Sequence, residues 1–169
     1  MQQEEPLRQD SLEREIRERL MGCIALEHSM SELYTMMAER YPQESAFFNA
    51  LAEEEVTHAL TLEAGELIGK IGHLDDQLTP PAARLVQGTM VSVERAKADI
   101  ATSAMSLADA LKTALMLEST TVERFYIQVA DESKGTPWQK YMLSIIADEQ
   151  GHIDRIRTRM LDLGISKHS

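Results

Sequence analysis

The chain has 169 residues, of which 43% are hydrophobic and 27% charged, and its formal net charge at pH 7 is −11. This length and composition predict one soluble globular domain rather than a disordered chain. The acidic charge argues against a surface that binds nucleic acid or an anionic membrane, and it suits the attraction of cations.

Targeting and cysteine patterns add to these exclusions. No apolar run approaches the ~20 residues that a bilayer span needs, and the N-terminal residues lack the basic and apolar pattern of a signal peptide. Cys23 is the only cysteine, which excludes an internal disulfide and a thiolate metal cluster. We therefore expect a cytoplasmic protein without a membrane partner.

Apolar residues at helical spacing predict two long helices in the first half of the chain. Residues 1–9 are polar and acidic and are interpreted as a flexible tail, so that the single domain covers 10–169. The first helix is predicted at about 11–40, where Tyr-Pro stops it. The second is predicted at 43–71, and the short turn between them makes the pair antiparallel.

The second half of the chain repeats this arrangement after a break rich in Asp and Pro. A shorter helix predicted at 81–100 is interpreted as a crossover between two hairpins. Ser106 is a candidate N-cap for a helix at 106–133, with Asp109 in its third position. A turn containing Gly and Pro leads into the last helix, at 137–163. The fold class predicted is an all-α four-helix bundle of two antiparallel hairpins.

Both predicted hairpins carry the same polar motif. Each has a Glu on its first helix and a Glu-x-x-His on its second. The six residues are Glu27, Glu55 and His58 in the first copy, and Glu118, Glu149 and His152 in the second. The offset between copies is constant within each helix and changes only at the turn, as expected of a duplicated hairpin.

The motif spacing predicts a site for two metal ions. Positions i and i+3 lie on one face of a helix, so each Glu-x-x-His can direct a carboxylate and an imidazole at one ion. Two such helices supply one His for each ion and two carboxylates, Glu55 and Glu149, that are able to bridge them. Glu27 and Glu118 then serve as terminal ligands. Oxygen and nitrogen ligands without thiolate suit iron, or alternatively manganese, better than structural zinc.

The same residues carry a resemblance to a known family. Residues 52–59, Ala-Glu-Glu-Glu-Val-Thr-His-Ala, and the pair Glu27 and Tyr34 resemble the rubrerythrin branch of the ferritin-like superfamily. The resemblance implies a ferritin-like bundle, a diiron site on the six residues above, and reaction with peroxide or oxygen.

Two departures from the family pattern qualify these expectations. Rubrerythrins carry a rubredoxin domain with paired Cys-x-x-Cys motifs, so the single cysteine here implies an external electron donor. Thr121 stands where the family has an additional Glu that lets one iron change its ligands. This disfavours peroxidase turnover by that route and leaves oxidation of ferrous iron.

Several residues near the six motif positions are candidate hydrogen-bond partners of the ligands. Tyr34 is predicted to donate its hydroxyl to a ligand carboxylate across the bundle. Phe125, at the equivalent position, has no hydroxyl, so Tyr126 is the candidate substitute, with plain packing as its alternative. Glu54 and Glu32 diverge from the ligand face and are assigned to the solvent side.

The leading hypothesis is a rubrerythrin-like oxidoreductase that acts in oxidative-stress defence or in ferrous iron oxidation. Its substrate is expected to be peroxide or oxygen. Two alternatives stay open: a dimanganese enzyme that acts like a catalase, and a non-enzymatic metal-binding or sensory bundle that docks a partner through its acidic faces. A homodimer is expected, because bundles of this kind often dimerise.

Overall fold

The computed structural model describes residues 4–72, 83–121, 126–132, 135 and 137–166. Within these ranges the protein is all-α and contains no strand. In chain order, the elements are α1 (Glu4–Arg40), the 3-10 helix η1 (Pro42–Glu44), α2 (Ser45–Gly72), α3 (Ala83–Ala101), α4 (Leu107–Thr121), α5 (Ile127–Glu132) and α6 (Pro137–Asp162). The predicted fold class is confirmed.

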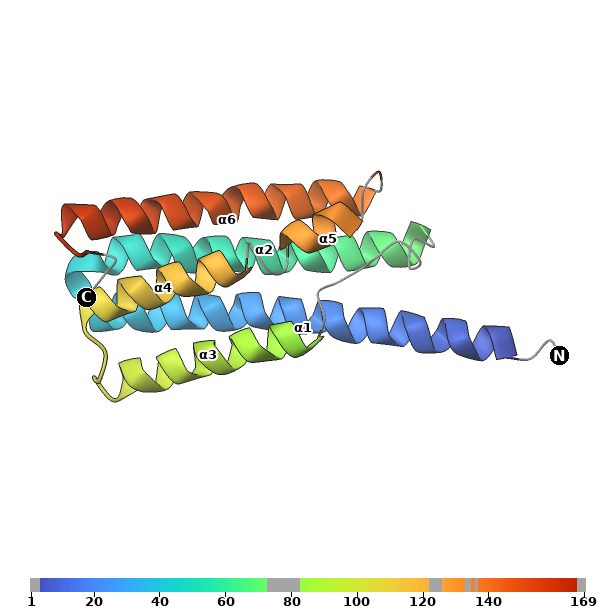
Figure 1. The fold of residues 1–169 in the computed structure, drawn as a ribbon, viewed down its shortest axis with the longest axis horizontal. Coiled ribbons are helices and arrows are strands. Elements are labelled where there is room, and N and C mark those ends of the chain that lie inside the picture. Colours follow the sequence, from blue (N-terminus) through green and yellow to red (C-terminus); the bar gives the residue numbers. More distant parts are fainter. Residues whose placement is uncertain (1–3, 73–82, 122–125, 133–134, 136, 167–169) are drawn as a thin grey trace.

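The long helices form two hairpins that lie side by side (Figure 1). Helices α1 and α2 run antiparallel and pack along each other, and α4 with α5 packs in the same way against α6. α3 lies outside this bundle against α1 and also touches α4. It thus occupies the crossover position that the sequence predicts. None of the helices in the described parts of the chain combines the length and apolar character needed to cross a bilayer.

Two predicted boundaries differ from the structure. α1 begins at Glu4, so the tail predicted at 1–9 is helical from that residue onward. A packed helix extends outward at low cost once it is nucleated. The helix predicted at 106–133 is described as α4 and α5, and residues 122–125 between them lie outside the described residues.

Local signals at other helix ends act as predicted. The Ser106 hydroxyl accepts a hydrogen bond from the Asp109 backbone N–H at 3.2 Å and donates to the Asp109 carboxylate at 2.6 Å. This reciprocal pair starts α4 as an N-cap. Beyond α6, Gly164 has a φ of 67°, and the N–H of Ile165 bonds the carbonyl of Met160 at 2.8 Å. A residue without a Cβ is favoured at this left-handed position.

The apolar core lies along the inward faces of the helices, whereas Val56 and Leu60, which also fall in the apolar pattern of the second helix, are exposed. Its largest fully buried side chains are Leu26, Leu33, Tyr34, Met37, Phe48, Leu51, Leu62, Leu111, Leu117, Tyr126 and Met142. Cys23 is also buried, and burial together with the nearby Glu27 carboxylate raises the pKa of its thiol to about 12. Cys23 therefore fills space in the core as a neutral thiol.

An aromatic cluster packs at the α1–α2 turn. The rings of Tyr34 and Phe48 stack with centroids 6.5 Å apart, and Tyr41 lies 6.2 Å from Phe48. The Tyr41 hydroxyl donates to the Met105 carbonyl at 2.7 Å and so ties this turn to the connection before α4. Because Tyr34 belongs to this cluster, close packing of its ring fixes its position.

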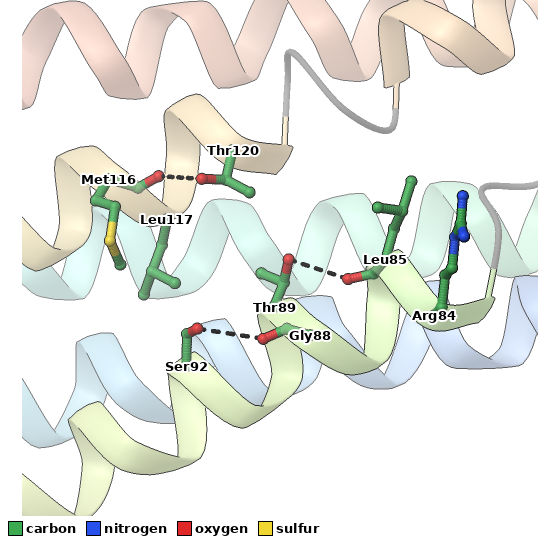
Figure 2. Close-up of a pocket in the computed structure, with 8 residues that line it drawn as sticks. All are labelled: Arg84, Leu85, Gly88, Thr89, Ser92, Met116, Leu117 and Thr120. Atoms are coloured by element: carbon green, nitrogen blue, oxygen red, sulfur yellow. Dashed lines mark hydrogen bonds between the residues drawn. The ribbon is translucent and has the colours of Figure 1, made fainter.

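A pocket of about 480 Å³ separates α3 from α4 (Figure 2). The side chains of Met116 and Leu117 extend from α4 toward α3. Three hydroxyls in its lining, from Thr89, Ser92 and Thr120, each donate to a carbonyl one turn earlier in their own helix. These hydroxyls are therefore satisfied within their own helices.

Candidate metal centre

The six residues of the repeated motif meet in the interior between the two hairpins. Each is contributed by the helix that the sequence predicts: Glu27 by α1, Glu55 and His58 by α2, Glu118 by α4, and Glu149 and His152 by α6. None of the six exposes more than 2% of its surface. Burying four carboxylates together is costly unless positive charge compensates them.

Around His58, three carboxylates approach the same ring nitrogen. Its Nδ1 lies 3.1 Å from Glu149 Oε1, 3.5 Å from Glu55 Oε2 and 3.9 Å from Glu27 Oε2. One donor atom from each of these four residues falls within 4.8 Å of the others. A single cation could accept all four.

Around His152 the arrangement repeats with the other terminal carboxylate. Its Nδ1 lies 3.2 Å from Glu55 Oε1, 3.4 Å from Glu118 Oε1 and 3.9 Å from Glu149 Oε2. These four residues form a second set whose donor atoms lie within 4.8 Å of one another. Glu55 and Glu149 belong to both sets, and the two imidazole rings stack with centroids 5.3 Å apart.

The donor atoms at the centre lack hydrogen-bond partners. Both oxygens of Glu55, one oxygen each of Glu118 and Glu149, and Nδ1 of both histidines are buried without one. Buried polar atoms in proteins are nearly always paired, so unpaired atoms that converge call for a ligand outside the protein. Oxygen and imidazole donors in this number suit a pair of divalent transition-metal ions, and the residues present therefore fit such ions.

The pKa values of the four carboxyl groups differ, because the groups are buried close together and act on one another. Burial and the Glu118 charge raise the pKa of Glu55 to about 7. Burial together with neighbouring carboxylates also raises the pKa of Glu27 and of Glu149. For Glu118, burial acts in the same direction, but the close approach of Glu149 and of the His152 imidazole outweighs it and lowers the pKa to about 2. Without cations the cluster therefore keeps protons that metal ions would have to displace.

The two histidines also differ in charge. Burial lowers the pKa of His58, and the nearby Glu27 offsets this only in part. Burial acts on His152 in the same direction, but Glu118 and Glu55 outweigh it and raise its pKa to about 10. Positive charge is therefore favoured at the His152 end of the site, where the carboxylates would equally attract a metal cation.

Two tyrosines cross between the hairpins. The Tyr34 hydroxyl on α1 donates to Glu118 on α4, and the Tyr126 hydroxyl just before α5 donates to Glu27 on α1. Both rings are buried. The structure thus gives Tyr126 a hydrogen bond in addition to packing, while Phe125 lies outside the described residues. Each terminal carboxylate is oriented by a phenol from the opposite hairpin.

Sequence reasoning placed Glu54 on the solvent side and did not consider Asp148 or Arg155. In the structure, Glu54 reaches across to α6, where its Oε2 lies 2.6 Å from Nε2 of His152 and its carboxylate accepts from Arg155. Asp148, at the equivalent place on α6, lies 3.8 Å from Nε2 of His58. The available signal was that each of these acids directly precedes a Glu of the Glu-x-x-His motif.

Other polar residues stay away from the centre. Glu32 is exposed and pairs with Lys97 at 2.6 Å, in agreement with its predicted surface position. Thr121 is buried, and its hydroxyl donates to the Leu117 carbonyl at 3.0 Å. The additional carboxylate that the family pattern would place here has no substitute in this side chain.

A cleft of about 540 Å³ opens above the site between α2 and α6. Its lining residues are Glu54, Thr57, His58, Ala147, Asp148, Gly151, Asp154 and Arg155. Of the two imidazoles in the site, His58 lines this cleft.

A bundle of two helical hairpins that buries four carboxylates and two imidazoles between them has the architecture of the ferritin-like class. The model of the rubrerythrin family matches residues 18–160, which is most of the chain. The chain therefore belongs to the rubrerythrin family. Comparisons with curated proteins and with solved structures found no match.

Proposed function

We propose that this protein is an oxidoreductase that holds two iron ions between its hairpins and oxidises them with peroxide or oxygen. The observation that carries the proposal is the pair of four-residue donor sets that share Glu55 and Glu149. The unpaired buried atoms of these sets support the proposal, because two adjacent cations would satisfy them. Family membership supports iron as the metal and peroxide or oxygen as the oxidant.

The residues of the chain have distinct tasks in this proposal. Glu55 and Glu149, which belong to both donor sets, would serve both ions. His58 and His152 would each supply one nitrogen, and Glu27 and Glu118 would each add a carboxylate to one set. The irons, when bound, supply the electrons that reduce the oxidant. Burial of the ligands keeps bulk water out of the site.

Thr121 favours one role within this class. Its hydroxyl bonds to the backbone of its own helix, so it provides no carboxylate toward which an oxidised iron could move. We therefore propose ferrous iron oxidation, and protection against peroxide through it, as the principal activity. In this proposal a separate protein or small molecule returns electrons to the site, since Cys23 is buried and lies in the core as a neutral thiol.

Anaerobic reconstitution of the full chain with ferrous iron tests the proposal. We expect two iron ions per chain after gel filtration. Adding peroxide to the loaded protein should consume one peroxide for every two ferrous ions oxidised, with two protons taken up and two waters formed. Iron content, residual peroxide and remaining ferrous iron are measured on the same samples.

The matched controls are Glu55→Ala with Glu149→Ala, and Glu53→Ala. The double variant should lose stoichiometric iron binding because both ions lose their shared ligands. The Glu53→Ala variant should bind as the parent does, because Glu53 is exposed on the same helix. Retention of two irons by the double variant would exclude the assigned ligands.

Metal analysis and an oxygen measurement distinguish the manganese alternative from the iron proposal. A catalase-like enzyme would release oxygen from peroxide when loaded with manganese, and it would do so over many turnovers without a reductant. If the protein isolated without added metal contains manganese and evolves oxygen, that alternative replaces the iron proposal.

A further inference from the structure

The two histidines of the site differ in the contacts of Nε2, the ring nitrogen that points away from the four buried carboxylates. Nε2 of His152 lies 2.6 Å from Glu54 Oε2, within hydrogen-bond distance. Arg155 donates to both oxygens of the same carboxylate, with Nη1 at 3.0 Å from Oε1. Glu54 is thereby fixed between a ring on α6 and a guanidinium one turn further along α6.

The other half of the site lacks this arrangement. Nε2 of His58 lies 3.8 Å from Asp148 Oδ2, which is too far for a hydrogen bond. The Asp148 side chain is 60% exposed. By the offset between the repeats, the position equivalent to Arg155 is Thr61, whose hydroxyl donates to the Thr57 carbonyl at 2.8 Å. A threonine carries no charge that could fix the Asp148 carboxylate.

The outer contact decides which ring nitrogen can bind a cation. A neutral imidazole carries its proton on one nitrogen and offers a lone pair on the other. An acceptor at Nε2 keeps the proton there and leaves Nδ1, which faces the carboxylates, free for the metal. When His152 gives up one proton to a cation, Glu54 favours retention of the other on Nε2, and its contact at 2.6 Å fixes the ring orientation. His58 has no such constraint at hydrogen-bond distance.

The two donor sets have the same number and kinds of residues. Each donor set has one histidine, one terminal carboxylate and the two shared carboxylates. His58 lines the cleft between α2 and α6, whereas His152 is not part of its lining. Glu54 and Arg155 line the same cleft, but of the two imidazoles in the site it is the looser one, His58, that borders it.

Resting on the proposed function, we propose that the two metal positions are inequivalent. The position served by His152 fills first and binds more tightly, and the position served by His58 fills second and exchanges its ion through the cleft. Glu54 and Arg155 act as positioning residues for the tight position.

Titration of the full-length, metal-free protein with Co²⁺ under argon, in competition with a chelator of known affinity, tests the order of filling. We expect two phases whose dissociation constants differ by at least about tenfold. Glu54→Ala should weaken the first phase by about 10–100-fold, the usual effect of removing a carboxylate behind a metal-binding histidine. Asp148→Ala is the matched variant and should change either phase by less than about threefold.

Two further measurements separate positioning from a general loss of structure. Glu54→Gln keeps an oxygen that can accept from Nε2, so it should recover most of the affinity lost in Glu54→Ala. Circular dichroism and urea unfolding of the metal-free variants should match the parent closely, because Glu54 is partly exposed and alanine suits a helix interior.

The outcomes distinguish the two proposals. Uptake of two Co²⁺ ions with equal affinity, or equal weakening by Glu54→Ala and Asp148→Ala, would overturn the inequivalence and leave the two-metal function intact. Failure of the parent protein to bind Co²⁺ at all would remove the proposed function and this inference together.

Discussion

In the first hairpin, Glu27 is met by the hydroxyl of Tyr126, and in the second Glu118 is met by the hydroxyl of Tyr34. Around the histidines the hairpins diverge, because His152 is bound on its outer side by Glu54 and His58 has only the distant Asp148. The inward-facing residues have kept the symmetry of the repeat. The residues one layer further out have not, so the duplicated motif does not give its two histidines identical surroundings.

Removing the metal should have the largest effect, since each donor set draws residues from both hairpins. Loaded protein is expected to melt more than about 10 °C above protein stripped with a chelator, because each tightly bound ion contributes a few kcal/mol and each kcal/mol shifts the melting temperature by about 2–4 °C. Differential scanning calorimetry measures this difference. Equal melting temperatures would mean that the acidic cluster is stable without cations.

A change in pH should alter the stability of the metal-free protein and of the metal-loaded protein in opposite directions. The pKa values of Glu55 and His152 are raised to about 7 and about 10, so the stability they contribute is present at low pH and lost as pH rises through those values. The lowered pKa of His58 opposes this in part. Between pH 8 and pH 6 the metal-free protein should gain on the order of 2 kcal/mol.

The loaded protein should lose stability over the same interval, because protons compete with the metal for the ligands. Urea unfolding at pH 6, 7 and 8 with and without bound metal measures both trends. A metal-free protein that becomes less stable on acidification would contradict the assigned direction of the pKa shifts.

Replacing each of the two tyrosines that donate to a carboxylate of the other hairpin tests whether the two hydrogen bonds contribute equally. Tyr34→Phe should cost about 2 kcal/mol in the metal-free protein, because Tyr34 donates to Glu118, whose lowered pKa keeps it ionised. Tyr126→Phe should cost about 1 kcal/mol, since Glu27 has a raised pKa and is a neutral acceptor. Urea unfolding of both variants measures the difference, and a larger loss for Tyr126→Phe would reverse this assignment.

The smallest effect is expected from Glu32→Ala. Glu32 lies on the ligand-bearing helix α1, but its carboxylate pairs with Lys97 of α3 at the surface. Exposed pairs of this kind contribute less than about 1 kcal/mol. The variant should bind metal as the parent does and unfold within about 0.5 kcal/mol of it, as measured by metal titration and urea unfolding.

Most of the bundle could be predicted from periodicity and helix-end signals. Pro137 opens α6 as predicted, and Ser106 with Asp109 caps α4, because these signals act within one turn of the chain. The start of α1 was placed too late, since helix propagation from a packed segment leaves no local signature. The break around 75–80 lies outside the described residues.

The candidate site was accessible to sequence reasoning for a similar reason. A Glu-x-x-His pair on one face is a local pattern, and its duplication indicated that Glu55 and Glu149 point toward one centre. Tyr126 was a candidate only because it adjoins the position equivalent to Tyr34. Its contact with Glu27 depends on how two hairpins are set against each other, which no spacing along one helix encodes.

The amino-acid sequence by itself determined the helices, the twofold repeat and the six inward-facing residues, because these follow from the 3.6-residue period of the helix. Only the tertiary structure decided that Glu54 and Arg155 hold one histidine while the other stays loose. Those contacts join side chains from different hairpins over a few ångströms. Their geometry is set by the packing of helices α2 and α6 and has no counterpart in the linear pattern.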